Sequence, residues 1–283
     1  NGKIHVNTVF TVNGNVCNST GNVNFDGTVV VNGDVQAGFS VKATGNITIV
    51  GNVEGASLEA GGDIRIVAGL VGQGRGKAVC GGNFKALFVE NAEVIARGDV
   101  TADVFLHSQV RCGGSLVAEG RKGAIIGGVC VVGRDIKALT VGSPSGVATS
   151  LELGVDPGVM ERMRLNKDRA CVLEQELGKL SQIINLLAPL KAAGKLPESK
   201  AEVLDKAIST KENYELEAVA LTAEREELGA SARDMANSQF ICRRDLYYGT
   251  KVTICQVPFT VPSDLSRCRI HLNTAKEIVV GLV

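Results

Sequence analysis

The chain has 283 residues, of which 45% are hydrophobic, so it is long enough to bury a core without disulfide or metal staples. Its 30 Lys and Arg residues balance its 30 Asp and Glu residues, which excludes a net field that would attract nucleic acid or an anionic membrane. Its apolar runs are shorter than a membrane span requires, and its start carries no charged-then-apolar leader. We therefore expect a cytoplasmic protein without membrane insertion or a nucleic-acid partner.

The cysteines are scattered, with no Cys-x-x-Cys motif and no close pair of histidines. This pattern signals neither a zinc site nor a redox dithiol, so we expect buried free thiols in a reducing compartment, and neither metal nor cofactor. The chain also begins at Asn1, directly in repeat-like sequence, which predicts that a natural N-terminal part is missing. The eight cysteines are Cys17, Cys80, Cys112, Cys130, Cys171, Cys242, Cys255 and Cys268.

A short phrase organises the first half of the chain: a glycine, then Asp, Asn or Ser, then an apolar residue. It returns every 16 to 20 residues, which is typical of a solenoid. We expect the first two positions of the phrase to adopt the positive φ angles of a sharp turn. The apolar residues two and four places after the glycine should then face inward, as on one side of a strand. The first set is Ile47, Ile64, Phe84, Val100, Leu116 and Ile136, and the second is Ile49, Ile66, Ala86, Ala102, Ala118 and Ala138.

Stacked coils of this kind place like residues in columns about 4.8 Å apart. The sequence therefore predicts a mainly β fold, with a parallel β-helix over residues 1–154. Because the coils differ in length, we expect the right-handed form rather than the left-handed form, which is built from strict six-residue turns.

Acidic residues recur along one edge of the predicted β-helix, as they do in the carboxylate clusters of polysaccharide-cleaving enzymes. Asparagine fills the same turn position in other coils, however, and Asn cannot serve as a catalytic acid or base. We expect turn formers and assign no catalytic residue. The acidic residues are Asp34, Asp63, Asp99 and Asp135, and the asparagines are Asn15, Asn46, Asn52 and Asn83.

Two glycine-rich basic insertions, residues 71–76 and 120–123, interrupt the repeat and are expected on neighbouring coils. Neither matches a phosphate-binding motif, so wide turns are the simpler interpretation and an anion or acidic partner is the alternative. The candidate anion-binding residues are Arg75, Lys77, Arg121 and Lys122.

The pattern changes at residue 155, where Asp156 is expected to cap a helix. Two heptad-spaced segments, separated by a break near Gly194, predict an antiparallel two-helix coiled coil over residues 155–237. Pairing outward from the turn sets Asn166 opposite Arg225. Projecting coiled coils usually grip a partner or another copy of the chain, and a plain spacer is the alternative. The candidate partner-binding residues are Leu177, Tyr214 and Leu228. The predicted seam is Val159, Met163, Asn166, Ala170, Leu173, Leu177, Leu180, Ile184 and Leu187 in the first helix, and Leu204, Ala207, Lys211, Tyr214, Ala218, Leu221, Arg225, Leu228, Ala232 and Met235 in the second.

Strand signals return from about Gln239, with Gly249 before Val252 and Ile254 as in the earlier coils. We expect residues 238–283 to rejoin the β-helix and cap its C-terminal end, so that the coiled coil is an insertion in one continuous fold.

The order of these parts resembles the bacterial flagellar assembly protein A family. The most specific segment runs from Gly142-Ser143-Pro144 to Gly154-Val155-Asp156-Pro157, before the coiled coil, and Tyr247-Tyr248-Gly249-Thr250 follows it. The resemblance implies a cytoplasmic, non-enzymatic protein with a separate N-terminal domain. It also implies a connection with flagellar assembly and placement at the cell pole through contacts with other proteins.

Three functions are compared. The leading hypothesis is a scaffold that binds partner proteins. The second is a bactofilin-like polymer, a homo-oligomer that stacks through uncapped β-helix ends. The third is a carbohydrate-active enzyme, which the aromatic content of 4% and the lack of Trp disfavour.

Overall fold

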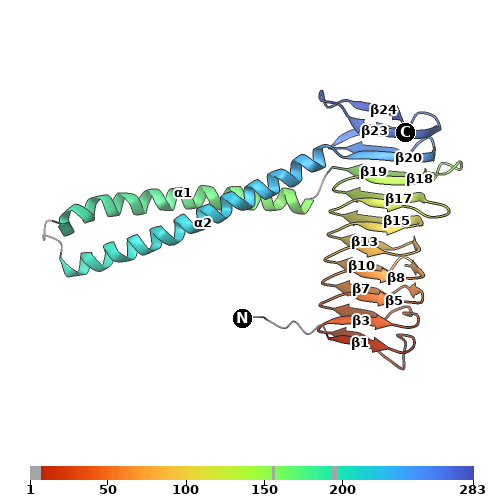
Figure 1. Ribbon diagram of the computed structural model, residues 1–283, viewed down its shortest axis with the longest axis horizontal. Coiled ribbons are helices and arrows are strands. Elements are labelled where there is room, and N and C mark those ends of the chain that lie inside the picture. The colour runs from red at the N-terminus through yellow and green to blue at the C-terminus, as the bar shows by residue number, and fades with distance from the viewer. Residues whose placement is uncertain (1–7, 155–156, 193–196) are drawn as a thin grey trace. The chain divides into compact units, whose positions relative to one another are not determined.

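The computed structural model describes residues 8–154, 157–192 and 197–283 of the chain. Short strands form successive stacked coils, from β1 (Val9–Val12) at one end to β20 (Gln239–Leu246) towards the other (Figure 1). The fold class predicted from the repeat is confirmed: the protein is a mainly β parallel solenoid with a pair of helices. Asp156 and Gly194, to which the sequence assigned a cap and a turn, lie outside the described residues.

Each coil places its strands in three parallel ladders. The first ladder carries the repeated phrase and consists of β1, β3 (Thr28–Val31), β5 (Ile47–Ile49), β8 (Ile64–Ile66), β11 (Phe84–Lys85), β14 (Val100–Ala102), β16 (Leu116–Ala118), β18 (Ile136–Val141) and β20. The second consists of β6 (Val53–Glu54), β9 (Gly69–Val71), β12 (Phe88–Glu90), the first parts of β15 (Val104–Cys112) and β17 (Ala124–Val132), and the last residues of β18 and β20. The third consists of β2 (Val23–Phe25), β4 (Ser40–Ala43), β7 (Ser57–Ala60), β10 (Lys77–Cys80), β13 (Glu93–Ala96), the second parts of β15 and β17, β19 (Thr149–Leu153) and β21 (Lys251–Ile254).

The interior is filled by columns of like residues, as the strand periodicity predicted. In the first ladder, Ile64 pairs with Ile47 on one side and with Phe84 on the other. These side chains and those of Val100, Leu116 and Ile136 are at most 1% exposed. Removing such a column from water stabilises the stack by roughly 1.5–3 kcal/mol for each large side chain.

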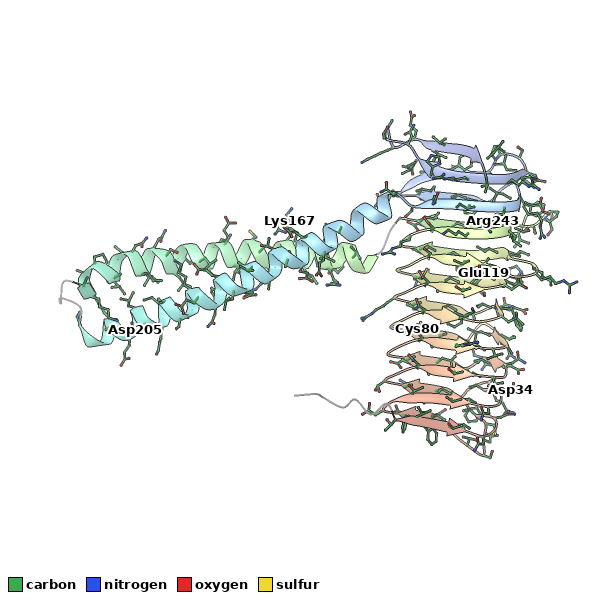
Figure 2. The ribbon with its side chains drawn as sticks, in the orientation of Figure 1. Asp34, Cys80, Glu119, Lys167, Asp205 and Arg243 are labelled. Carbon is green, nitrogen blue, oxygen red and sulfur yellow. The ribbon has the colours of Figure 1, made fainter. Side chains whose placement is uncertain are left out.

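At most turns of the phrase, a side-chain oxygen of Asn or Asp binds the turn to the next coil. Asp63 Oδ1 accepts a hydrogen bond from the backbone N–H of Asn83 at 2.7 Å, and Asn83 Oδ1 accepts one from Asp99 at 2.8 Å. Asp34, labelled in Figure 2, does the same for Asn52 at another turn, at 2.7 Å. The Asp residues are therefore turn formers, and Asn serves equally well because it presents the same Oδ1 acceptor.

The glycines of the phrase do not adopt the positive φ angles that the sequence predicted for them. Positive φ angles are not found at Gly61, Gly62, Gly81 or Gly82. A Cβ at Gly81 would instead collide with the carbonyl oxygen of Gly61, so glycine is needed because successive turns approach closely.

Residues with positive φ angles recur at a different corner, between the second and third ladders. His107 has a φ of 47° at the bend of β15, and Gly127 has a φ of 69° at the corresponding bend of β17. This corner carries no repeated phrase, so the sequence did not mark it.

The helices follow β19, and the solenoid resumes after them with β20. They are α1 (Pro157–Ala192) and α2 (Glu198–Ala236). The chain divides into two compact units, residues 1–156 with 234–283 and residues 157–233. Gln239, just after α2, donates its backbone N–H to Asp135 Oδ1 at 3.0 Å. The helices therefore occupy the turn at which the repeated phrase stands in other coils.

Antiparallel strands complete the C-terminal end of the solenoid. β22 (Val257–Thr260) pairs antiparallel with β21, while β23 (Leu265–Leu272) pairs antiparallel with β20 and with β24 (Ile278–Leu282). The uniform parallel stacking therefore ends with β20 and β21.

Candidate functional site

The two helices pack through the seam that the heptad spacing predicted. Leu173 in α1 and Leu204 in α2 are each 1% exposed. The other predicted seam positions of α1 are buried or half-buried, and so are those of α2 except Arg225, which is exposed. Ala232 and Met235 lie outside the described side chains.

One polar seam residue binds differently from the prediction. Asn166 is 4% exposed, and its Nδ2 donates to the Leu221 carbonyl oxygen and to Glu224 Oε2, each at 3.0 Å. The hydrogen bonds of Asn166 therefore go to Leu221 and Glu224 and not to Arg225, the residue predicted to lie opposite it. Asn166 and Arg225 do line a common groove of about 440 Å³ together with Leu228.

Two ion pairs along one edge fix the register of the helices. Arg162 contacts Glu224 at 2.9 Å, and Arg169 binds Glu217 with two hydrogen bonds of 2.7 and 2.8 Å. The hydrogen bonds from Arg169 hold the pKa of the Glu217 carboxyl below its usual value. A step of seven residues along α1 is thus matched by seven residues back along α2, as in an antiparallel pair.

The partner-binding residues proposed from the sequence lie in this seam. Leu177 and Tyr214 are half-buried, and Leu228 is 4% exposed. Each side chain is therefore largely engaged by the opposite helix, and only part of Leu177 and Tyr214 is open to another molecule.

Exposed apolar residues that the sequence reasoning missed lie near the far end of the helices. We call Ile183, Leu186, Leu190 and Val203 the distal patch; they are 39%, 71%, 44% and 50% exposed. Two more heptads in the register of Arg169 and Glu217 set Ile183 opposite Val203, so the patch draws on both helices. Its signal in the sequence is a second stripe beside the seam, with residues 183, 186 and 190 spaced by three and four.

An ion pair between the helices lies beside the distal patch. Lys191 in α1 binds Asp205 in α2 at 2.7 Å, and Figure 2 labels Asp205 near the end of the pair. An apolar centre with a polar margin is the arrangement common in protein interfaces.

The sequence predicted that the two basic loops lie on neighbouring coils, and this prediction is wrong. Residues 71–76 join β9 to β10, at the corner between the second and third ladders. Residues 119–123 join β16 to β17, at the corner between the first and second ladders. β12 and β15 separate β9 from β17 in the second ladder, so the loops are apart along the stack as well.

Backbone N–H groups in both loops already donate to acceptors within the chain. In the first loop, Gly74 donates to the Asn91 carbonyl at 3.1 Å and Gly76 to the Gly72 carbonyl at 2.7 Å. In the second, Lys122 and Gly123 donate to Asp103 Oδ1 at 2.9 and 2.6 Å. The carboxylate of Asp103 thus takes the position that an external anion would occupy.

The basic side chains of the loops differ in their contacts. Arg75, Arg121 and Lys122 are exposed. Lys77 lies in β10 and forms an ion pair with Glu93 at 3.1 Å. Glu93 also contacts Arg111 at 3.5 Å.

At the turns of the phrase, Asp63 and Asp99 are separated by the coil of Asn83, and each accepts a backbone hydrogen bond from the following coil. Within residues 8–154, 157–192 and 197–283, no three His, Cys, Asp or Glu side chains gather as metal ligands would. In the same part of the chain, neither helix is long and apolar enough to cross a membrane.

Comparison with known families decides what this arrangement belongs to. Residues 8–278 match the Flagellar Assembly Protein A beta solenoid domain, which covers the solenoid and the helix pair together. The chain belongs to this family. Searches of curated proteins and of solved structures found no match. Membership in the flagellar assembly protein A family confirms the resemblance drawn from residues 142–157 and associates the chain with flagellar assembly.

Proposed function

We propose that this protein is a non-enzymatic scaffold of flagellar assembly that works in the cytoplasm, at the cell pole, by holding partner proteins on its helix pair. The family match supports the assembly role. The distal patch supports the binding of partner proteins by the helix pair, and that part of the proposal rests on this single observation. Four apolar side chains from two helices are turned to solvent in a pair whose register is fixed by the seam and by ion pairs.

Exposed leucines on a rigid pair are energetically unfavourable in isolation. Covering one Leu side chain fully would stabilise a complex by roughly 1.5–3 kcal/mol relative to leaving it in water. Leu186, at 71% exposure, has most of this free energy still available to a partner. The helices are already ordered, so a partner would not have to fold them, which keeps the entropic cost of binding low.

The seam residues then have a supporting role. Leu177, Tyr214 and Leu228 hold the helices in register and present the distal patch, and the partner contact is made by the exposed residues. A polar substitution in the seam would separate the helices, and the resulting loss of binding would say little about where a partner sits. The test therefore requires exposed residues.

The experiment compares two matched double variants in a flagellated cell whose own copy of the gene is deleted. Leu186→Glu with Leu190→Glu alters the distal patch, and Leu216→Glu with Val219→Glu alters exposed residues of α2, each 70% exposed, outside it. We expect the first to abolish rescue of flagellar number and swimming, and the second to restore both. Circular dichroism at 222 nm on each purified protein checks that the helices remain folded. Equal rescue by both folded variants would refute the distal patch as the working surface.

The self-assembling polymer remains the second candidate because of one observation. Among the residues that the structure describes, β1 pairs only with β3, and Val9 and Phe10 of β1 are 58% and 42% exposed. A strand at the edge of a sheet can pair with another chain.

A further inference from the structure

Two cysteines face each other where the chain returns from the helices to the solenoid. Cys242 in β20 lies directly opposite Cys268 in β23 in the antiparallel register, next to the pair formed by Ile241 and Arg269. Directly opposed residues point to the same face of a sheet, and here that face is the interior. Cys242 is 0% exposed and Cys268 is 2% exposed.

The separation fits a covalent bond between them. Opposed residues of antiparallel strands have Cα atoms about 4.5–5.5 Å apart, inside the range of about 4.4–6.8 Å that disulfides span. Cys80 and Cys112 make a useful contrast. Ala96 lies between them in the third ladder, which separates them by two strand spacings, or roughly 9–10 Å.

The two thiols are also chemically unequal. Cys242 Sγ lies 3.3 Å from the carbonyl oxygen of Leu139. The hydrogen bond between the two thiols, together with burial, raises the pKa of Cys242, while the same hydrogen bond lowers the pKa of Cys268. Cys268 is therefore the thiol that ionises first and is the better nucleophile, since the thiolate is the reactive form.

We propose that Cys242 and Cys268 form an oxidation site that a peroxide converts to a cross-strand disulfide. In the first step the Cys268 thiolate attacks a peroxide oxygen, the O–O bond breaks, and with one proton the products are the Cys268 sulfenic acid and water. In the second step the Cys242 sulfur attacks the Cys268 sulfur, the S–O bond breaks, and the hydroxide leaves with the Cys242 proton as water. The two thiols lose two electrons, and hydrogen peroxide gains them as it becomes two waters.

The bond would tie the strand that follows α2 to the C-terminal strands. β20 already pairs with β18 in the stack, and β23 pairs with β24. A disulfide here closes a loop that contains β21 and β22, so the end of the solenoid can no longer separate strand by strand.

The test is peptide mapping after hydrogen peroxide treatment of the folded protein, with the remaining thiols alkylated in denaturant before digestion with trypsin. We expect the peptide of residues 234–243 to carry the dipeptide Cys268-Arg269, and dithiothreitol to release it. Cys130→Ser, which removes another buried thiol, is the control and should leave the linked peptide unchanged, whereas Cys268→Ser should abolish it. If Cys268→Ser fails to fold, the presence or absence of the linked peptide in the folded wild-type protein still decides the question. Full alkylation of both thiols after oxidation, or equal linkage when the protein is oxidised in urea, would overturn the proposal.

Discussion

Single side chains at the turns bind successive coils to one another. Asn46, Asp63, Asn83 and Asp99 each present an Oδ1 to a backbone N–H of the following coil. What the position requires is an acceptor of fixed length, and a negative charge is not needed. This explains why the two residue types alternate along the turns.

A pair of variants at Asp63 separates the acceptor from the charge. Asp63→Asn keeps the Oδ1 and should leave the unfolding midpoint nearly unchanged. Asp63→Ala leaves the Asn83 N–H without its partner and should lower the free energy of unfolding by about 1 kcal/mol. Urea denaturation of both variants beside the wild type measures this, and a larger loss for Asp63→Asn than for Asp63→Ala would contradict it.

The inward residues were predictable from the sequence, and the reason for the glycines was not. Phe84 and Val100 stand at fixed places after a glycine, and a strand has only two sides, so their burial followed directly. Gly81 could have been selected for a positive φ or for close contact, and the sequence looks the same in both cases. Only the carbonyl of Gly61 in the preceding turn distinguishes them.

Glycine substitution should have opposite effects in the two kinds of element. Gly81→Ala places a Cβ against the Gly61 carbonyl in the solenoid and should destabilise the protein by roughly 1–3 kcal/mol. Gly178→Ala lies on α1, where a Cβ meets nothing within 4 Å, and should stabilise the helix pair by about 1 kcal/mol. Scanning calorimetry, with circular dichroism at 222 nm for the helices, checks both signs. A neutral result at Gly81 would show that neighbouring turns give way easily.

The helix pair should lose stability as the solution is acidified. The pKa of Glu217 is lowered in the folded protein by its hydrogen bonds to Arg169, so its contribution is complete above its usual pKa of 4.5 and is lost as the pH falls through the lower folded value. Thermal melting followed by circular dichroism at 222 nm should give a higher melting temperature for the wild type than for Glu217→Gln at neutral pH. The difference between the two melting temperatures should disappear between about pH 5 and about pH 3. Because the pair is exposed, added salt should narrow the gap too. A gap that widens on acidification would reverse this assignment.

At the level of elements, the heptad pattern predicted the seam but not the exposed distal patch. A heptad reports which residues face the opposite helix, so it selected Leu177, Tyr214 and Leu228, which the pair itself engages. Leu186 belongs to a second stripe that becomes visible only when the seam is known. The prediction that the two basic loops lie on neighbouring coils was wrong for a related reason. The repeated phrase marks one corner of each coil, and the loops lie at the other two corners.

The solenoid ends differently at its two sides. Within the described residues β1 pairs with β3 alone, while at the other end β22 and β24 run antiparallel to their neighbours, and Pro258 in β22 has no N–H to donate. A second copy therefore cannot continue the parallel stack from that end.

Head-to-tail filaments should accordingly not form. Light scattering from low to high micromolar concentration should give one particle size, because elongation requires complementary edges at both ends. A size that increases steadily with concentration would support the polymer instead. A single step to a fixed larger size would indicate a closed oligomer.

The turn that holds the helices has a consequence for how this architecture can change. In one coil Ala96 is joined to Val100 by three residues, while in another the corresponding connection from Leu153 to Gln239 holds the whole helix pair. The Asp135 to Gln239 hydrogen bond is kept across the larger connection. We therefore expect that helices of another length or sequence can be inserted at this corner without a change in the neighbouring coils.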